Sequence, residues 1–154
     1  MKAILKSEKP NILVPVLNEN ASMLVYKDFP KDYRGWVYLY CTKGGRNLVF
    51  GDVFRGDWDT EYILTYGWSR KKADEIWGVL NGKVVARFYC DKVEDIRFIG
   101  CSCETDSLDE IDLGKKSCLL FSEIYNYLKG KNGYAVHISQ LEIFVDEPKG
   151  LWEF

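Results

Sequence analysis

Apolar side chains alternate along several short stretches of the chain, and this alternation predicts β-strands. Residues 36–42 (WVYLYCT) place apolar or aromatic side chains on both faces of a strand, so this strand is expected to be central and buried. Residues 83–93 (KVVARFYCDKV) predict a long strand, which residues 94–100 (EDIRFIG) continue or bend. The core face of this long strand is expected to carry Val84, Ala86, Phe88 and Cys90. Shorter strands are predicted at residues 1–7, 22–27, 134–138 and 141–147.

Apolar positions three and four residues apart predict helices at residues 69–82 and 118–130. A shorter helix is expected at residues 10–18, where Pro15 removes one backbone N–H group and limits its regularity. Residues 103–116 (CETDSLDEIDLGKK) are rich in acidic and small residues and predict a surface loop. The inward face of the 118–130 helix is expected to carry Leu120, Ile124, Tyr127 and Leu128.

The order of these segments predicts the fold class. Six or seven strands with two or three helices, not in strict alternation, indicate an α+β protein with a mostly antiparallel, barrel-like sheet. A chain of 154 residues without an internal linker predicts a single domain over residues 1–154. With 47% hydrophobic residues, such a domain can bury a substantial core.

Charge and cysteine usage narrow the function classes. A net charge of −2 argues against a surface that binds polyanions everywhere, although a local basic groove stays possible. No apolar run approaches the roughly 18 residues of a membrane span, and no secretory signal opens the sequence. An odd number of cysteines, 5, then predicts a reduced, cytoplasmic protein. Cys101 and Cys103 form the one close pair, which lacks a second pair or a nearby His, so neither a metal nor another cofactor is expected.

Four motifs are spread over nearly the whole chain. In sequence order they are VYLYCTKGG at residues 37–45, GDVFRGDW at residues 51–58, NGKVVARFYCDKV at residues 81–93 and, after a helix, GYAVHISQLEIFVDEPKGLWEF at residues 133–154. Together and in this order they resemble the ASCH domain family, most closely its phage-type members. The resemblance implies a PUA-like β-barrel whose cleft takes RNA, a modified base or a nucleoside.

The chain departs from the family's signature, G-x-K-x-x-E-x-R, at all of its defining positions. In the matching stretch ENASMLVY, Glu19 replaces the Gly, Ala21 the Lys, Leu24 the acid and Tyr26 the Arg. Some bacterial relatives are amidohydrolases of acetylated cytidine that use the signature Lys and an acid from a later strand. Many relatives carry a Glu where this chain has Arg87. The resemblance therefore predicts no catalytic residues here, and the stretch is interpreted as a plain strand of the barrel wall.

Basic and aromatic residues remain as candidates for binding. Lys43 and Arg46 flank a glycine pair in a loop that can approach a phosphate, and Arg55 lies among aromatic residues suited to stacking on bases. Arg70 opens a basic cluster at a predicted helix start, where an anion would be favoured. With Tyr26, these four residues are predicted to border a cleft that binds single-stranded nucleic acid or a modified nucleoside.

Two other functions stay open. An accessory protein that binds a host or phage protein is favoured by the acidic residues 104–112 and the negative net charge. A nucleoside amidohydrolase is disfavoured by Ala21, Leu24 and Arg87. His137, the single histidine, is expected to be a hydrogen-bonded structural residue. The sequence leaves the oligomeric state open.

Overall fold

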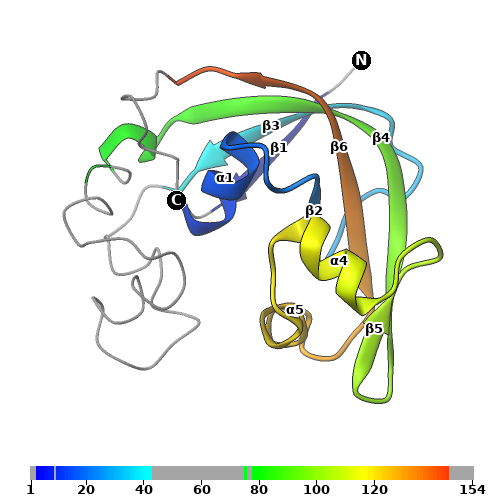
Figure 1. Ribbon diagram of the computed structural model, residues 1–154. Helices are drawn as coiled ribbons and strands as arrows, with labels where there is room; N and C mark the ends of the chain where they lie inside the picture. The colour runs from blue at the N-terminus through cyan, green and yellow to red at the C-terminus, as the bar shows by residue number, and fades with distance from the viewer. Residues whose placement is uncertain (1–2, 9, 43–74, 76–77, 146–154) are drawn as a thin grey trace. The chain divides into compact units, whose positions relative to one another are not determined.

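The computed structural model describes residues 3–8, 10–42, 75 and 78–145 of the chain. These residues form a mixed set of strands and helices, so the predicted α+β class is confirmed (Figure 1). The strands are β1 (Ile4–Glu8), β2 (Met23–Tyr26), β3 (Gly35–Cys41), β4 (Val84–Ile99), β5 (Ser102–Glu104) and β6 (Gly133–Ile143). The helices with described bounds are α1 (Pro10–Leu17), α4 (Glu110–Ser117) and α5 (Phe121–Leu128).

The strands form one sheet of 6 strands in the order β1-β3-β4-β6-β2, with β5 paired to β4 beside this path. Strands β2 and β6 are antiparallel, as are β4 and β5. The end of β3 meets the start of β4, because the N–H of Cys41 donates to the carbonyl of Lys83 at 2.8 Å. The N–H of Phe144 donates likewise to Val85 at 2.8 Å, which joins the end of β6 to the start of β4. The prediction of a mostly antiparallel sheet is therefore confirmed.

The chain divides into two compact units. The first comprises Met1–Asn18, Tyr38–Arg87 and Glu142–Phe154, and the second comprises Glu19–Val37 and Phe88–Leu141. Strands β3, β4 and β6 each contribute residues to both units, whereas β2, β5, α4 and α5 belong wholly to the second.

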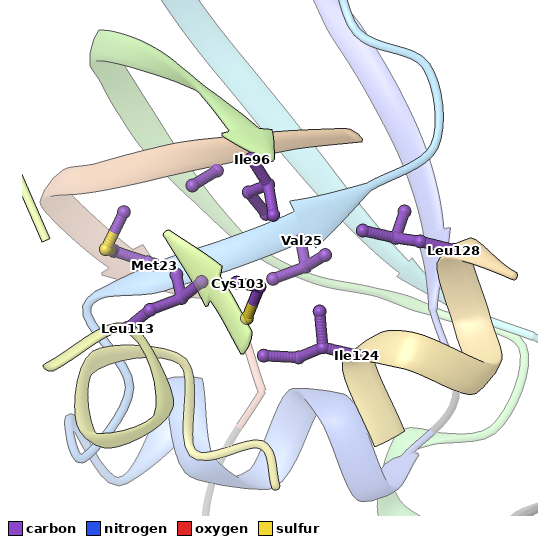
Figure 2. Packing of buried hydrophobic residues seen from close by; sticks show 8 residues of the cluster. Met23, Val25, Ile96, Cys103, Leu113, Ile124 and Leu128 are labelled. Atoms are coloured by element: carbon purple, nitrogen blue, oxygen red, sulfur yellow. The ribbon is translucent and has the colours of Figure 1, made fainter. Parts of the chain in front are cut away.

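The second unit has a well-defined apolar core, shown in Figure 2. Strands β2, β4, β5 and β6 contribute side chains from one side, and helices α4 and α5 cover them. Burying a side chain of this size stabilises a fold by roughly 1.5–3 kcal/mol, so the core holds both helices on the sheet. Its buried members are Met23, Val25, Ile96, Cys103, Leu113, Ile124, Leu128 and Ala135.

The central strands follow the sequence pattern closely, with one correction. In β3, Val37, Leu39 and Cys41 are fully buried, as predicted, whereas the residues of the other face are half-buried rather than buried. In β4, Val84 was predicted to face the core but is 40% exposed, whereas Val85 is fully buried. The strict alternation is broken here because two consecutive residues, Val85 and Ala86, are both buried.

The acidic segment 103–116 was predicted to be a loop, and this prediction is wrong. Its first residues lie in β5, and its last ones form helix α4. The Asp109 side chain caps the helix by accepting a hydrogen bond from the N–H of Asp112 at 2.8 Å. Acidic residues in the first turn and Lys115 and Lys116 in the last turn both suit the helix dipole.

Helix α5 begins later than the sequence pattern suggested. Leu120, predicted to face inward, is the residue before the helix and is 68% exposed. Tyr127 was also predicted to face inward but is 43% exposed, so the buried face reduces to Ile124 and Leu128. The helix starts at Phe121 because the Leu120 N–H is held by the Glu123 carboxylate at 3.0 Å.

Two strands predicted near the C-terminus are one. Residues 134–138 and the beginning of 141–147 both belong to β6, which runs without interruption from Gly133 to Ile143. Gln140 adopts the left-handed conformation, with φ at 49°, at the point where the sequence suggested a break. The strand therefore keeps its pairing through a local irregularity.

Among the described residues, no helix is long and apolar enough to cross a membrane. The predicted helix at residues 69–82 falls largely outside the described part of the chain, in which residues 78–80 are helical and Leu80 is fully buried. Helix α1 forms as predicted and includes Pro15.

We predict that Leu113→Ala lowers the free energy of unfolding by about 2–5 kcal/mol, because it leaves a cavity in the core of the second unit. Ile111→Ala is the matched control, since Ile111 lies on the same helix but is 65% exposed. Its effect should stay within about 0.5 kcal/mol. Urea unfolding of both variants measures the difference, and equal losses would contradict the position of α4 on this core.

Candidate functional site

Most of the binding residues predicted from the sequence fall outside the described part of the chain. These are Lys43, Arg46, Arg55 and Arg70. Tyr26, the remaining member, lies in β2 and is only 3% exposed. Its ring stacks on Phe29 with centroids 5.6 Å apart. The structure thus places Tyr26 in the interior of the second unit, and the predicted cleft stays a prediction.

The stretch aligned with the family signature is buried from Met23 to Tyr26, whereas Glu19, Asn20 and Ser22 before the strand are exposed. Ala21 and Leu24 are 6% and 4% exposed, and every residue of β2 is buried. Its backbone is fixed at the start of β2, where the N–H of Ser22 donates to the carbonyl of Lys116 at 2.7 Å and the carbonyl of Ser22 accepts from the N–H of Ile138 at 2.9 Å. Residues 21–26 therefore behave as a structural strand, in line with the interpretation drawn from the sequence.

The most developed polar cluster of the second unit surrounds Glu94, a carboxylate on β4 whose side chain is only 3% exposed. One of its oxygens, Oε1, accepts hydrogen bonds from the backbone N–H of Ser107 at 3.0 Å and from its hydroxyl at 2.6 Å. The other, Oε2, lies 2.6 Å from Nε2 of His137 on β6. Lys92 Nζ approaches the same oxygen at 4.0 Å. We call these residues the Glu94 network.

The network keeps its central carboxylate charged. Burial alone would raise the pKa of Glu94, but hydrogen bonds from Ser107, His137 and Thr105 outweigh burial and lower the pKa to about 2. An ionised carboxylate can only accept hydrogen bonds, so His137 must carry a proton on Nε2. The hydrogen-bonded role predicted for His137 is thereby confirmed.

The order of these bonds decides what the network can do. In a nucleophilic triad the histidine lies between the hydroxyl and the acid, so that it can take the hydroxyl proton. Here the carboxylate lies in the middle, and the Ser107 hydroxyl donates to Glu94 rather than to His137. The arrangement fixes the 105–108 turn to β4 and β6, and it does not activate Ser107 as a nucleophile.

A second cluster lies in the first unit, on β3, β4 and the end of β6. Arg87 donates from Nε to the Glu142 carboxylate at 2.7 Å and from a terminal nitrogen to the Tyr38 hydroxyl at 3.1 Å. Its guanidinium carbon lies 5.8 Å from the centroid of the Tyr38 ring, and that ring lies 6.2 Å from Phe144. We call these four residues the Arg87 cluster.

In the Arg87 cluster, each partner of the ion pair shifts the pKa of the other in the direction that favours its charged form. Hydrogen bonds to Glu142 and Tyr38 raise the pKa of Arg87, and the bond from Arg87 lowers the pKa of Glu142. Both groups therefore stay charged at neutral pH. The sequence resemblance suggested that an Arg had displaced a catalytic acid at this position. The structure adds that the Arg has its own carboxylate partner on a neighbouring strand, which is not a catalytic pair.

The cysteines occupy different environments. Cys103 is 1% exposed within the apolar core, whereas its neighbour Cys101 is exposed. Burial raises the pKa of the Cys41 thiol to about 12, which keeps this residue a neutral core side chain. Within the described residues, no group of three or more His, Cys, Asp or Glu side chains is arranged to hold a metal ion.

No protein-family model matches the chain, and no curated protein matches it. The resemblance to the ASCH family accordingly rests on the quoted motifs, and functional inference rests on the two clusters.

We predict that Glu94→Gln lowers the free energy of unfolding at pH 7 and makes it less dependent on pH. Because the folded pKa of Glu94 is about 2, below its ordinary value of 4.5, ionised Glu94 stabilises the fold above that ordinary value. The stabilisation is lost as the pH falls through about 2. At pH 7 the variant should lose on the order of 2 kcal/mol, since a charge-assisted network is broken.

Denaturant unfolding between pH 7 and about 2 tests this, and the curve of the variant should be flatter than that of the wild type. Asp91→Asn is the control, because Asp91 is an exposed carboxylate on the same strand. If Glu94→Gln and wild type lose stability in parallel as the pH falls, Glu94 is not the acid-sensitive group.

Proposed function

We propose that the protein is a noncatalytic, ASCH-type module with a PUA-like barrel that binds single-stranded nucleic acid or a modified base. The observation that carries this proposal is the Arg87 cluster, an arginine and two aromatic rings on adjoining strands. Interleaved arginine and aromatic side chains suit contact with unpaired bases, because every base has a π-face and a nearby phosphate.

The exposure of the cluster supports a role in binding. Phe144 is 48% exposed at the end of β6, although a large apolar ring is more stable when covered. Tyr38 is half-buried and anchors the Arg87 guanidinium above its ring. Glu142 fixes the same guanidinium from the side, so that its plane is held before a ligand arrives. A base that stacks on Phe144 would lie beside a preorganised cation.

The residues at the signature positions favour a noncatalytic role. Ala21 and Leu24, at the positions of the signature Lys and acid, are buried apolar residues. Neither can polarise an amide or accept a proton. In the Glu94 network, Ser107 is bonded to a carboxylate rather than to the imidazole. Hydrolysis of an acetylated nucleoside therefore has no acid–base pair at these positions.

The sheet is compatible with the proposed barrel. Its six strands are mostly antiparallel, and β4, with 16 residues, is long enough to contribute to both units. Strands that pass from one packed sheet to another through a bend form the corners of barrel-like sandwiches, so a strand as long as β4 suits the proposal. Closure of the barrel is part of the proposal.

We predict that Phe144→Ala weakens the binding of a short, labelled single-stranded RNA by about tenfold, because base stacking on an aromatic ring contributes about 1–3 kcal/mol. Fluorescence anisotropy at low salt measures the affinity. Leu5→Ala is the matched control, since Leu5 is a 60% exposed apolar residue of the same unit. It should bind as wild type does.

The alternative function, an accessory protein that binds another protein, is favoured by exposed apolar side chains of α4, of α5 and of the residue before α5. Ile111, Leu120 and Tyr125 are 65%, 68% and 46% exposed, and Ile111 lies in the acidic first turn of α4. Absence of RNA and DNA binding by the wild type at low salt would overturn the nucleic-acid proposal and favour this alternative.

A further inference from the structure

Near the turn between α5 and β6, an exposed aromatic ring at the end of α5 lies beside a lysine that follows β2. Lys27, directly after β2, places Nζ 5.1 Å from the centroid of the Tyr127 ring. Tyr127 lies in the last turn of α5 and is 43% exposed. A cation over a ring face is a favourable pairing, and it leaves the ring at the surface.

Two more lysines lie in the same turn. Lys129 ends α5 in the left-handed conformation, with φ at 55°, and the N–H of Lys131 donates to the carbonyl of Leu128 at 3.1 Å. Strand β6 then begins at Gly133, whose neighbour Tyr134 pairs with Tyr26 at the end of β2. Lys27 therefore lies beside the turn that carries Lys129 and Lys131.

The end of α5 and the end of β2 approach Gly133 so closely that the position has no room for a side chain. A Cβ atom at this position would lie 2.6 Å from a methyl group of Leu128 and 2.9 Å from the carbonyl oxygen of Tyr26. Such distances are far below van der Waals contact. The end of β2, which Lys27 follows, is thus packed closely against the end of α5, where Lys129 lies.

The lysines of this turn differ from those basic residues of the second unit whose charges are neutralised by ion pairs. Lys31 pairs with Asp95, and Arg97 pairs with Glu104 and Asp106. For Lys129 and Lys131, by contrast, no ion pair is found with any residue that the structure describes.

The acidic residues of the adjoining segments are few. Asp28 follows Lys27 along the chain, and Glu123 lies in the first turn of α5, at the far end of the helix. Lys27, Lys129 and Lys131 outnumber them, so the turn keeps a net positive charge. Local excess charge of this kind attracts a polyanion even on a protein of negative net charge.

We propose that Lys27, Tyr127, Lys129 and Lys131 form a second contact surface for single-stranded nucleic acid. This inference rests on the proposed function. The lysines neutralise backbone phosphates, and the Tyr127 ring stacks on an unpaired base. A double-stranded ligand would not fit this chemistry, because its bases are covered by their neighbours.

The experiment is a salt titration of binding to a short, labelled single-stranded RNA. A variant with both Lys129→Gln and Lys131→Gln is compared with one carrying Lys115→Gln and Lys116→Gln. The second pair is the matched control, because its lysines are also exposed and near a helix C-terminus in the same unit. Each lost phosphate contact reduces the slope of log K against log salt by about 0.7, so the first variant should lose about 1.4.

Tyr127→Leu separates stacking from charge. It should lower the affinity severalfold and leave the salt slope unchanged, because no phosphate contact is removed. Circular dichroism and unfolding curves of all the variants confirm that they are folded. Competition by polyglutamate tests whether the surface fits an acidic protein instead, and it should be much weaker than competition by unlabelled RNA.

The outcomes separate this inference from the proposed function. If wild type binds RNA but the Lys129/Lys131 variant keeps the wild-type slope, the second contact surface is wrong and the proposed function stands. A loss of slope that is equal in the Lys115/Lys116 variant, or equal competition by polyglutamate, would also overturn the surface. No binding by wild type at low salt would overturn the proposed function itself.

Discussion

The buried carboxylate of Glu94 constrains the strand pairing of the second unit, because its charge must be compensated by hydrogen bonds. Glu94 is nearly inaccessible to water, and an isolated carboxylate in such a place would cost several kcal/mol. Ser107 and His137 supply the compensating hydrogen bonds, but they do so from segments far from Glu94 in the sequence. A shift of β4 by one residue would turn the carboxylate to the other face of the sheet. The network therefore specifies which residues of β4 and β6 may face each other.

The sequence predicted an element well where the pattern of its own apolar residues determines the structure, and poorly where a cap or a neighbouring strand does. The alternation in residues 36–42 was sufficient to predict β3, because its period of two matches a strand in which every second residue is fully buried. Helix α4 was missed because it buries little apolar surface, with Leu113 as its one large buried residue, and relies on the Asp109 cap. Strand β6 was divided wrongly at Gln140, since polar residues resemble a turn unless the neighbouring strands are known.

The Glu94 network and the Arg87 cluster could not be predicted from the sequence for a different reason. Arg87 and Glu142 are 55 positions apart, and Glu94 and His137 are 43 apart, so neither pair leaves a motif. The sequence did single out Arg87 as an unexpected residue and His137 as a hydrogen-bonded one. What it could not supply was strand register, which determines the partner of each. The predicted basic residues between 43 and 70 lie outside the described part of the chain.

The packing at Gly133 has an evolutionary consequence. No side chain fits there without displacing Leu128 or the backbone of Tyr26, so selection for folding alone holds this position as glycine. The flanking lysines are not constrained by packing in this way, because they are exposed. Descendants of this sequence are therefore free to exchange the charges of the turn one at a time while its shape is inherited unchanged. Ligand preference and architecture can evolve at different rates within the same few residues.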